Sequence, residues 1–253
     1  MNYIGIDIGS TCAKTVVLNE KKEFIQEFVQ PTGWSSVDTA EEILQKLKLA
    51  GINLSDDPSC CVATGYGRIS VPYADKAVTE ITCHALGAVH LFHQPDLTVI
   101  DIGGQDTKII QIEQGFVKDF IMNDKCAAGT GRFLEVMDNT LSLRPNEMFE
   151  LARLGSDTTI SSMCTVFAES EVIGLIGKGE PKENIAYAVV DSTIRKVTAQ
   201  LSRMNGEMST FCLTGGLCEC EYIREALSKK LGKEVISSPD ARYAGAIGAA
   251  LSA

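Results

Sequence analysis

The stretches "IDIGSTCAK" (residues 6–14) and "IDIGGQDTK" (residues 100–108) decide the fold of this chain. They align without a gap at an offset of 94 residues, and five of the nine positions are identical. Each copy leads into a second apolar run, "TVVL" after the first and "IIQI" after the second. Both copies therefore predict a strand, a tight glycine turn and a returning strand.

Two further pairs of segments follow in the same order. Short apolar strands ending in Thr-Gly are predicted in "CCVATGYG" (60–67) and "FCLTGG" (211–216). Small-residue helices are predicted in "CHALGAVHLF" (83–92) and "YAGAIGAALSA" (243–253), where glycine and alanine allow close helix crossing. Three pairs in one order indicate a duplicated α/β fold.

The later offsets are larger than the first, so the second half carries an insertion within residues 115–208. We therefore expect two lobes, residues 1–95 and residues 96–253, each ending in its own small-residue helix. A chain of 253 residues is long enough for a sizeable core in this arrangement.

The composition excludes several classes of protein. Hydrophobic residues make up 45% and charged residues 22% of the chain, and the formal net charge is −10. An acidic chain is a poor match for nucleic acid, and the apolar runs are too short to cross a membrane. The beginning "MNYIGID" resembles no targeting segment. We expect a cytoplasmic protein with no nucleic-acid or membrane partner.

The two glycine turns are candidate phosphate sites, because successive backbone N–H groups in such turns can hold an anion. Neither a Walker P-loop nor a dinucleotide fingerprint is present, since "GSTCAKT" and "GTGRFL" lack the required glycines. Nucleotide binding therefore rests on the paired turns. The residues that would bind phosphate are Gly9, Ser10, Thr11, Gly103, Gly104 and Gln105.

Charged residues accompany both turns. Asp7 and Asp101 end their predicted strands at the turns, where they could hold Mg²⁺ through water. Lys14 could reach a phosphate group as a point charge. One such turn alone is as often an ordinary hairpin, but the duplicated pair favours a nucleotide site.

Nine cysteines are many for a reducing compartment, where disulfides are disfavoured. Burial as small apolar residues is the usual explanation, and we expect it for Cys60, Cys61, Cys83 and Cys212. Cys218 and Cys220 form a "CEC" pair that lacks enough ligands for a closed zinc site.

Several longer motifs resemble one family. These are "ATGYGR" (63–68), "IDIGGQDTK" (100–108), "MNDKCAAGTGRFLEVM" (122–137), "MCTVFAESEV" (163–172) and "TGG" (214–216). They are similar to the activator components of 2-hydroxyacyl-CoA dehydratases, which belong with the BadF/BadG/BcrA/BcrD-type ATPases. The resemblance implies the duplicated actin/sugar-kinase/heat-shock-chaperone-type ATPase fold, with two lobes and a nucleotide cleft between them.

The resemblance also implies a role for two cysteines. Cys126 and Cys164 match the residues with which each subunit of a homodimer holds one shared [4Fe–4S] cluster. The chain offers no closely spaced run of cluster ligands, whereas two chains would supply the four thiolates that such a cluster needs. Helices are predicted directly after both cysteines.

The implied activity is transfer of a low-potential electron, driven by ATP hydrolysis, to a partner dehydratase or acyl-CoA reductase. Gln105 would lie near the attacking water, and Gly215 and Gly216 against the adenosine of ATP or ADP. A ferredoxin or flavodoxin would supply the electron. A small-molecule kinase or a nucleotide-gated scaffold of the same superfamily remains an alternative, although neither would use the two cysteines.

Overall fold

The structure is a computed structural model that describes residues 1–54, 58–123, 125–144, 146–161, 164–204 and 210–253. Its contacts divide the chain into two compact units. Unit 1 comprises Met1–Leu97, Ile110–Lys118 and Asp240–Ala253, and unit 2 comprises Thr98–Ile109 and Asp119–Pro239.

Unit 1 is built on a five-stranded sheet with the order β3-β2-β1-β4-β5. Its two repeat strands form an antiparallel hairpin, and β1 pairs in parallel with β4. Its elements are β1 (Asn2–Ile8), β2 (Cys12–Leu18), β3 (Phe24–Pro31), α1 (Ser36–Leu49), β4 (Ser59–Thr64), η1 (Arg68–Ser70), β5 (Lys76–Ala77), α2 (Glu80–Phe92) and α8 (Ala244–Leu251).

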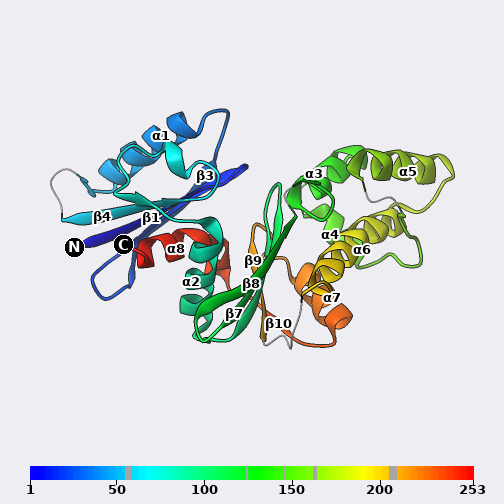
Figure 1. Ribbon diagram of the computed structural model, residues 1–253. Coiled ribbons are helices and arrows are strands. Elements are labelled where there is room, and N and C mark those ends of the chain that lie inside the picture. The colour runs from blue at the N-terminus through cyan, green and yellow to red at the C-terminus, as the bar shows by residue number, and fades with distance from the viewer. Residues whose placement is uncertain (55–57, 124, 145, 162–163, 205–209) are drawn as a thin grey trace. The chain divides into compact units, whose positions relative to one another are not determined.

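The two faces of β1 pack against different helices, because successive side chains of a strand point to opposite faces. Ile4, Ile6 and Ile8 are fully buried and pack with Ile43 and Leu47 of α1. On the other face β1 presents Gly5 to α8, and the two helices lie on opposite sides of the sheet (Figure 1).

Glycines let α8 approach its neighbours at backbone distance. A Cβ atom at Gly5 would overlap the carbonyl oxygen of Ala246, and one at Gly87 of α2 that of Ala244. A Cβ atom at Gly248 would likewise overlap the carbonyl oxygen of Cys83. The helices α2 and α8 therefore cross at backbone distance, an approach that their small residues allow.

The C-terminal helix departs from the predicted lobe boundaries. We expected residues 96–253 to form one lobe that ends in its own helix, but Asp240–Ala253 belongs to unit 1. The physical reason is the glycine packing of α8 against both β1 and α2, which are elements of unit 1. The two predicted small-residue helices are therefore partners and not equivalents.

Unit 2 is built on the second sheet, with the order β10-β9-β6-β7-β8. The repeat hairpin is now β6 and β7, whose outer residues, together with the start of β8, are counted in unit 1. The elements are β6 (Leu97–Ile102), β7 (Thr107–Glu113), β8 (Phe116–Asn123), α3 (Gly131–Thr140), α4 (Glu147–Ala152), α5 (Thr165–Gly177), α6 (Lys182–Leu201), β9 (Thr210–Gly215), α7 (Glu221–Leu231), β10 (Val235–Ile236) and the short helix η2 (Pro239–Tyr243), which leads into unit 1.

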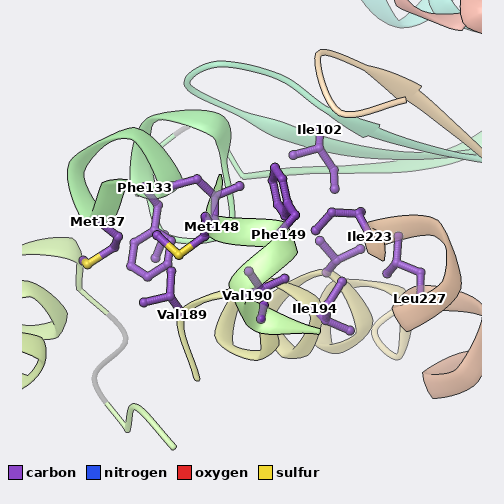
Figure 2. Packing of buried hydrophobic residues seen from close by; sticks show 14 of the residues in the cluster. Ile102, Phe133, Met137, Met148, Phe149, Val189, Val190, Ile194, Ile223 and Leu227 are labelled. Carbon is purple, nitrogen blue, oxygen red and sulfur yellow. The ribbon is translucent and has the colours of Figure 1, made fainter. Parts of the chain in front are cut away.

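The core of unit 2 lies between its sheet and the helices of the insertion. Phe133 of α3 and Phe149 of α4 are buried with Val189 and Ile194 of α6 and with Ile102 of β6. Figure 2 shows these side chains converging from the separate elements, with Ile223 and Leu227 of α7 completing the cluster. The insertion therefore folds as part of this core.

The predicted strands and helices are confirmed. Both repeats form hairpins, both Thr-Gly segments end strands, and helices follow Cys126 and Cys164 as α3 and α5. Two motif residues, Asp124 and Met163, lie outside the described residues. No helix in the described part of the chain combines the length and apolar character that a bilayer-spanning helix needs.

We predict that Gly248→Ala lowers the free energy of unfolding by about 3 kcal/mol, because the new methyl group overlaps the backbone of α2. Gly174→Ala is the matched control, since that glycine lies in α5 with nothing within 4 Å of the added Cβ. It should leave stability unchanged or raise it slightly. Urea denaturation of both variants is the measurement, and equal stabilities would contradict the packing described for α8.

Candidate functional site

The first half of the candidate site lies where three strand ends of unit 1 meet. Parallel pairing of β1 and β4 brings Asp7 beside Thr64, and the returning strand places Lys14 opposite Asp7 on the same face. The intervening turn is closed by a hydrogen bond of 3.1 Å from the Gly9 N–H to the Cys12 carbonyl oxygen. Ser10 and Thr11 are exposed at its tip.

Asp7 is buried and incompletely paired. Only 2% of the residue is exposed, and its Oδ1 atom has no hydrogen-bond partner among the described residues. Glycines surround it, since a Cβ at Gly65 would lie 2.5 Å from Oδ1 and one at Gly245 2.6 Å from Oδ2. A buried carboxylate oxygen without a partner is unfavourable unless a cation or water satisfies it, so this residue fits a Mg²⁺ ligand.

The second half repeats this geometry in unit 2. The Gly103 N–H donates to the Asp106 carbonyl oxygen at 2.9 Å, as Gly9 does to Cys12. Gly215 has a φ angle of +82°, against +83° at Gly65, a backbone conformation that favours glycine. A Cβ at Gly215 would lie 2.9 Å from Asp101 Oδ1, in the manner of Gly65 and Asp7.

The two carboxylates differ in their partners. Asp101 Oδ1 accepts a hydrogen bond of 2.8 Å from the Thr214 hydroxyl, and Oδ2 lies 3.3 Å from the Lys108 ammonium. The same ammonium lies 2.8 Å from Asp106 Oδ1. Asp101 is therefore neutralised by the protein, and its expected role as a second magnesium ligand stays a prediction.

The loop that carries Cys126 is anchored to the second glycine turn. Asn123 donates to the Cys126 carbonyl oxygen at 2.8 Å, which orders the loop locally. At the start of α3, the Gly131 N–H donates to the Gly103 carbonyl oxygen at 2.9 Å, and the Arg132 N–H donates to that of Gly104 at 2.8 Å. The half-buried thiol of Cys126 thus lies five residues before a direct backbone contact with the turn.

Cys164 occupies a more open position. It is exposed and is the N-cap residue of α5, with its carbonyl oxygen accepting from the Ala168 N–H. The helix that follows buries only Ala168 and Val172. Four further apolar side chains of α5 are unusually exposed for this residue type: Val166 66%, Phe167 67%, Ile173 56% and Ile176 46%. Leu175 is partly buried against the core of unit 2.

Most other cysteines are packing residues. Cys61, Cys83 and Cys212 are fully buried, as expected, and burial raises the pKa of the Cys61 thiol to about 12 and that of Cys83 to about 11. Cys60 is half-buried. Burial also raises the pKa of Cys220, the N-cap residue of α7, which does not favour a metal-binding thiolate.

The cysteines do not form a complete metal site within one chain. Among the described residues no group of three or more His, Cys, Asp or Glu side chains is arranged to hold a metal ion. Cys126 and Cys164 alone would not complete the four thiolates that a [4Fe–4S] cluster usually needs.

Sequence reasoning missed two members of the site. Thr214 and Lys108 are both fully buried at Asp101. The signal for Lys108 was its identity with Lys14 in the repeat, but the repeat did not show that Lys108 is fully buried whereas Lys14 is half-buried. The signal for Thr214 was its place in the Thr-Gly segment, which is shared with Thr64.

Comparisons with known proteins agree with this geometry. Residues 4–253 match the model of the BadF/BadG/BcrA/BcrD ATPase family. The chain is 43% identical over 251 residues to the (R)-2-hydroxyglutaryl-CoA dehydratase activating ATPase of Acidaminococcus fermentans, covering 98% of this chain and 95% of that one. It is 40% identical over 253 residues to the activator of lactoyl-CoA dehydratase of Anaerotignum propionicum, covering 99% and 96%.

Solved structures support the same relationship. The activator of the 2-hydroxyisocaproyl-CoA dehydratase from Clostridium difficile, solved with bound ADPNP, matches with a TM-score of 0.90 and 34% identity over 100% of this chain and 94% of that one. A ROK family glucokinase from Streptomyces griseus matches with a TM-score of 0.63 at 16% identity, over 100% and 99% of the two chains. The latter shows the fold alone, which is the predicted actin/sugar-kinase/heat-shock-chaperone type.

The two half-sites predict opposite effects of the same substitution. Asp7→Asn should raise the free energy of unfolding by about 1 kcal/mol, because it removes the charge of a buried carboxylate whose Oδ1 atom has no hydrogen-bond partner among the described residues. Asp101→Asn should lower it by about 3 kcal/mol, because it removes an ion partner of Lys108. Urea denaturation without nucleotide or Mg²⁺ is the measurement. Equal losses in both variants would contradict the difference between the half-sites.

Proposed function

The chain belongs to the BadF/BadG/BcrA/BcrD ATPase family, and we propose that it is the ATP-hydrolysing activator of a partner 2-hydroxyacyl-CoA dehydratase or related acyl-CoA reductase. ATP hydrolysis would drive the transfer of a low-potential electron to that partner. The observation that carries this proposal is the hydrogen-bonded contact between the loop of Cys126 and the glycine turn at Gly103 and Gly104. It joins a candidate phosphate site to a candidate cluster ligand within one unit.

We assign nucleotide binding to the two turns and to the Thr-Gly segment of β9. The Gly9 and Gly103 N–H groups close the turns, so the following N–H groups, of Ser10 and Thr11 and of Gly104 and Gln105, would face the phosphates. These four residues are exposed or half-buried, and the exposed Gly216 suits the adenosine. Lys14 is half-buried on the face of Asp7, where its ammonium group would neutralise phosphate charge. The proposed set is Gly9, Ser10, Thr11, Lys14, Gly103, Gly104, Gly215 and Gly216.

We assign the hydrolytic step to three side chains. Asp7 would hold Mg²⁺, whose charge would assist phosphate release, because its unpaired Oδ1 atom has the chemistry of a hard-cation ligand. Gln105 is exposed at the tip of the second turn and would orient the attacking water. Asp101 would be held in a fixed, ionised form beside that turn by Lys108 and Thr214.

We assign Cys126 and Cys164 as ligands of a [4Fe–4S] cluster that two chains share. Such a cluster, when bound, supplies a one-electron carrier. The exposed apolar side chains of α5 directly after Cys164 support a homodimer, because large exposed apolar patches mark interaction surfaces. A second copy of the same helix would cover them and bring the missing thiolates.

The connection between hydrolysis and electron transfer would run through α3. Its first two residues donate backbone hydrogen bonds to Gly103 and Gly104, so a shift of the turn on hydrolysis would move the start of this helix. Cys126 precedes the helix by five residues and would shift with it.

The alternatives account for fewer of the features. A small-molecule kinase shares the fold, as does a nucleotide-gated scaffold, but neither explains an exposed Cys164 at the start of an apolar helix face. The relatives' names support a dehydratase partner for this chain. A ferredoxin or flavodoxin donor and a cytoplasmic location remain predictions.

We predict that Cys164→Ser and Cys126→Ser each abolish iron and sulfide incorporation while the chain stays folded, because Cys164 is exposed and Cys126 is only partly buried at the edge of the unit 2 core. Iron analysis after anaerobic reconstitution, with circular dichroism as the folding check, is the measurement. Cys60→Ser is the matched control, since it alters a half-buried thiol of unit 1 and should retain about four iron atoms per dimer. Full iron content in either of the first two variants would refute the assignment.

The nucleotide assignment predicts a separation of binding from hydrolysis. Gln105→Ala should lower kcat for ATP hydrolysis by about 100-fold with little change in ADP affinity, because the side chain acts on the attacking water. Asp7→Ala should abolish Mg²⁺-dependent turnover. Gln26→Ala, on the exposed strand β3, is the control and should behave as the wild-type protein. Unchanged turnover in both site variants would rule out these roles.

A further inference from the structure

We propose that Lys108 is a positioning residue for ATP hydrolysis, whose buried ammonium group holds Asp101 and Asp106 and thereby fixes the Gly103–Gln105 turn. This inference rests on the proposed function, because it assigns a role within the turn that would orient the attacking water. Lys108 would not touch the nucleotide, and it would act through the two carboxylates.

The burial of Lys108 requires a reason. Only 1% of the residue is exposed, although a lysine is rarely buried unless its charge is paired. Its Nζ atom lies 2.8 Å from Asp106 Oδ1 and 3.3 Å from Asp101 Oδ2, and both aspartates are themselves buried. Two buried carboxylates therefore share this ammonium group. A buried ion pair costs desolvation free energy and is weak evidence for a purely stabilising role, which favours a functional one.

The group joins three segments of unit 2. Asp101 lies near the end of β6, Asp106 directly precedes β7, and Lys108 is the second residue of β7. The Thr214 hydroxyl donates to Asp101 Oδ1 at 2.8 Å, which attaches the end of β9 to the same group. The chain Thr214–Asp101–Lys108–Asp106 therefore connects the segment assigned to adenosine with the turn assigned to hydrolysis.

Asp106 transmits the constraint to the turn. Its carbonyl oxygen accepts from the Gly103 N–H at 2.9 Å, and its Oδ1 atom would lie 2.6 Å from a Cβ at Gly103. Both the backbone and the side chain of Asp106 thus close over the first residue of the turn. Gln105 is the residue before Asp106, and its exposed side chain is presented from a backbone held in this way.

The first repeat lacks the same arrangement. Lys14 aligns with Lys108 and Asp7 with Asp101, but Cys12 stands where the second repeat has Asp106. Lys14 is half-buried, and Asp7 keeps an oxygen without a partner. The duplication therefore has two outcomes, a turn whose aspartate remains available to a cation and a turn whose aspartate is fixed by a lysine.

The test compares Lys108→Met, Lys108→Met/Asp106→Asn and the control Lys118→Met. Lys108→Met alone leaves two buried carboxylates without a cation and could fail to fold, whereas the double variant removes one of them. Lys118 pairs with Glu113 at 2.9 Å with its side chain 45% exposed, so its loss should have no effect. Melting temperature, hydrogen–deuterium exchange of residues 100–108 without nucleotide, and steady-state ATP hydrolysis are measured for each.

We expect the double variant to fold, with the amides of the turn exchanging about 10-fold faster than in the wild-type protein. Its kcat should fall about 100-fold while KM for ATP changes less than about threefold, because the turn is misplaced but the phosphate-binding groups remain. A folded double variant with wild-type exchange and kcat would overturn the inference, because Lys108 would then only balance charge. Failure of both Lys108 variants to fold would overturn it too, by giving Lys108 a global structural role.

The exchange measurement separates this inference from the proposed function. A wild-type protein that hydrolyses no ATP would refute the function, and the exchange rates would still show whether Lys108 fixes the turn. Conversely, normal wild-type hydrolysis with unaltered exchange in the double variant would refute the role of Lys108 alone.

Discussion

The structure depends on a close backbone approach at the carboxyl ends of two buried strands. The carbonyl oxygens of Ile8 and Ile102 accept N–H groups from Gly67 and Gly216, in the segments that follow the Thr-Gly strands. At both places a glycine with positive φ brings these segments against an aspartate, and any side chain there would collide with it. This constraint puts each carboxylate at a strand end beside a glycine turn, and the rest of the candidate site follows from it.

The two strand ends share this backbone geometry but differ in the side chains that surround each aspartate. In unit 1, Gly65 and Gly245 surround Asp7 and contribute no side-chain donor, so one carboxylate oxygen stays without a partner among the described residues. In unit 2, Thr214 and Lys108 each contact one oxygen of Asp101. If both aspartates lacked partners, the protein would lose stability twice through burial of an unsatisfied carboxylate. If both were paired, neither would be readily available as a cation ligand. The duplicated fold therefore permits a division of roles that a single turn could not provide.

Much of the fold could be predicted from the sequence, because the repeat carries its information locally. Strand, turn and returning strand are specified within nine residues, and the cysteines are followed by apolar helical periods. The helix and strand that pack against α8 could not be predicted. Glycines such as Gly5 and Gly248 indicate a close backbone approach, but they do not indicate which element approaches. Lys108 was overlooked for a similar reason: a lysine in a strand is usually solvated, and its burial here accompanies ion pairs with both Asp101 and Asp106.

The position of α3 would let the insertion connect the proposed phosphate-binding turn with the two proposed cluster ligands. The helix begins at the second glycine turn, and near its other end the Thr140 hydroxyl donates to Glu169 of α5 at 3.1 Å. Phe133 and Met137 anchor its buried face in the core of unit 2 (Figure 2). A helix held at both ends and along one side moves as a rigid element, because packed interiors deform little. In the proposed mechanism, displacement of the turn would therefore reach Cys126, five residues before α3, and also α5, the helix that follows Cys164, so that one short helix would move both cysteines together.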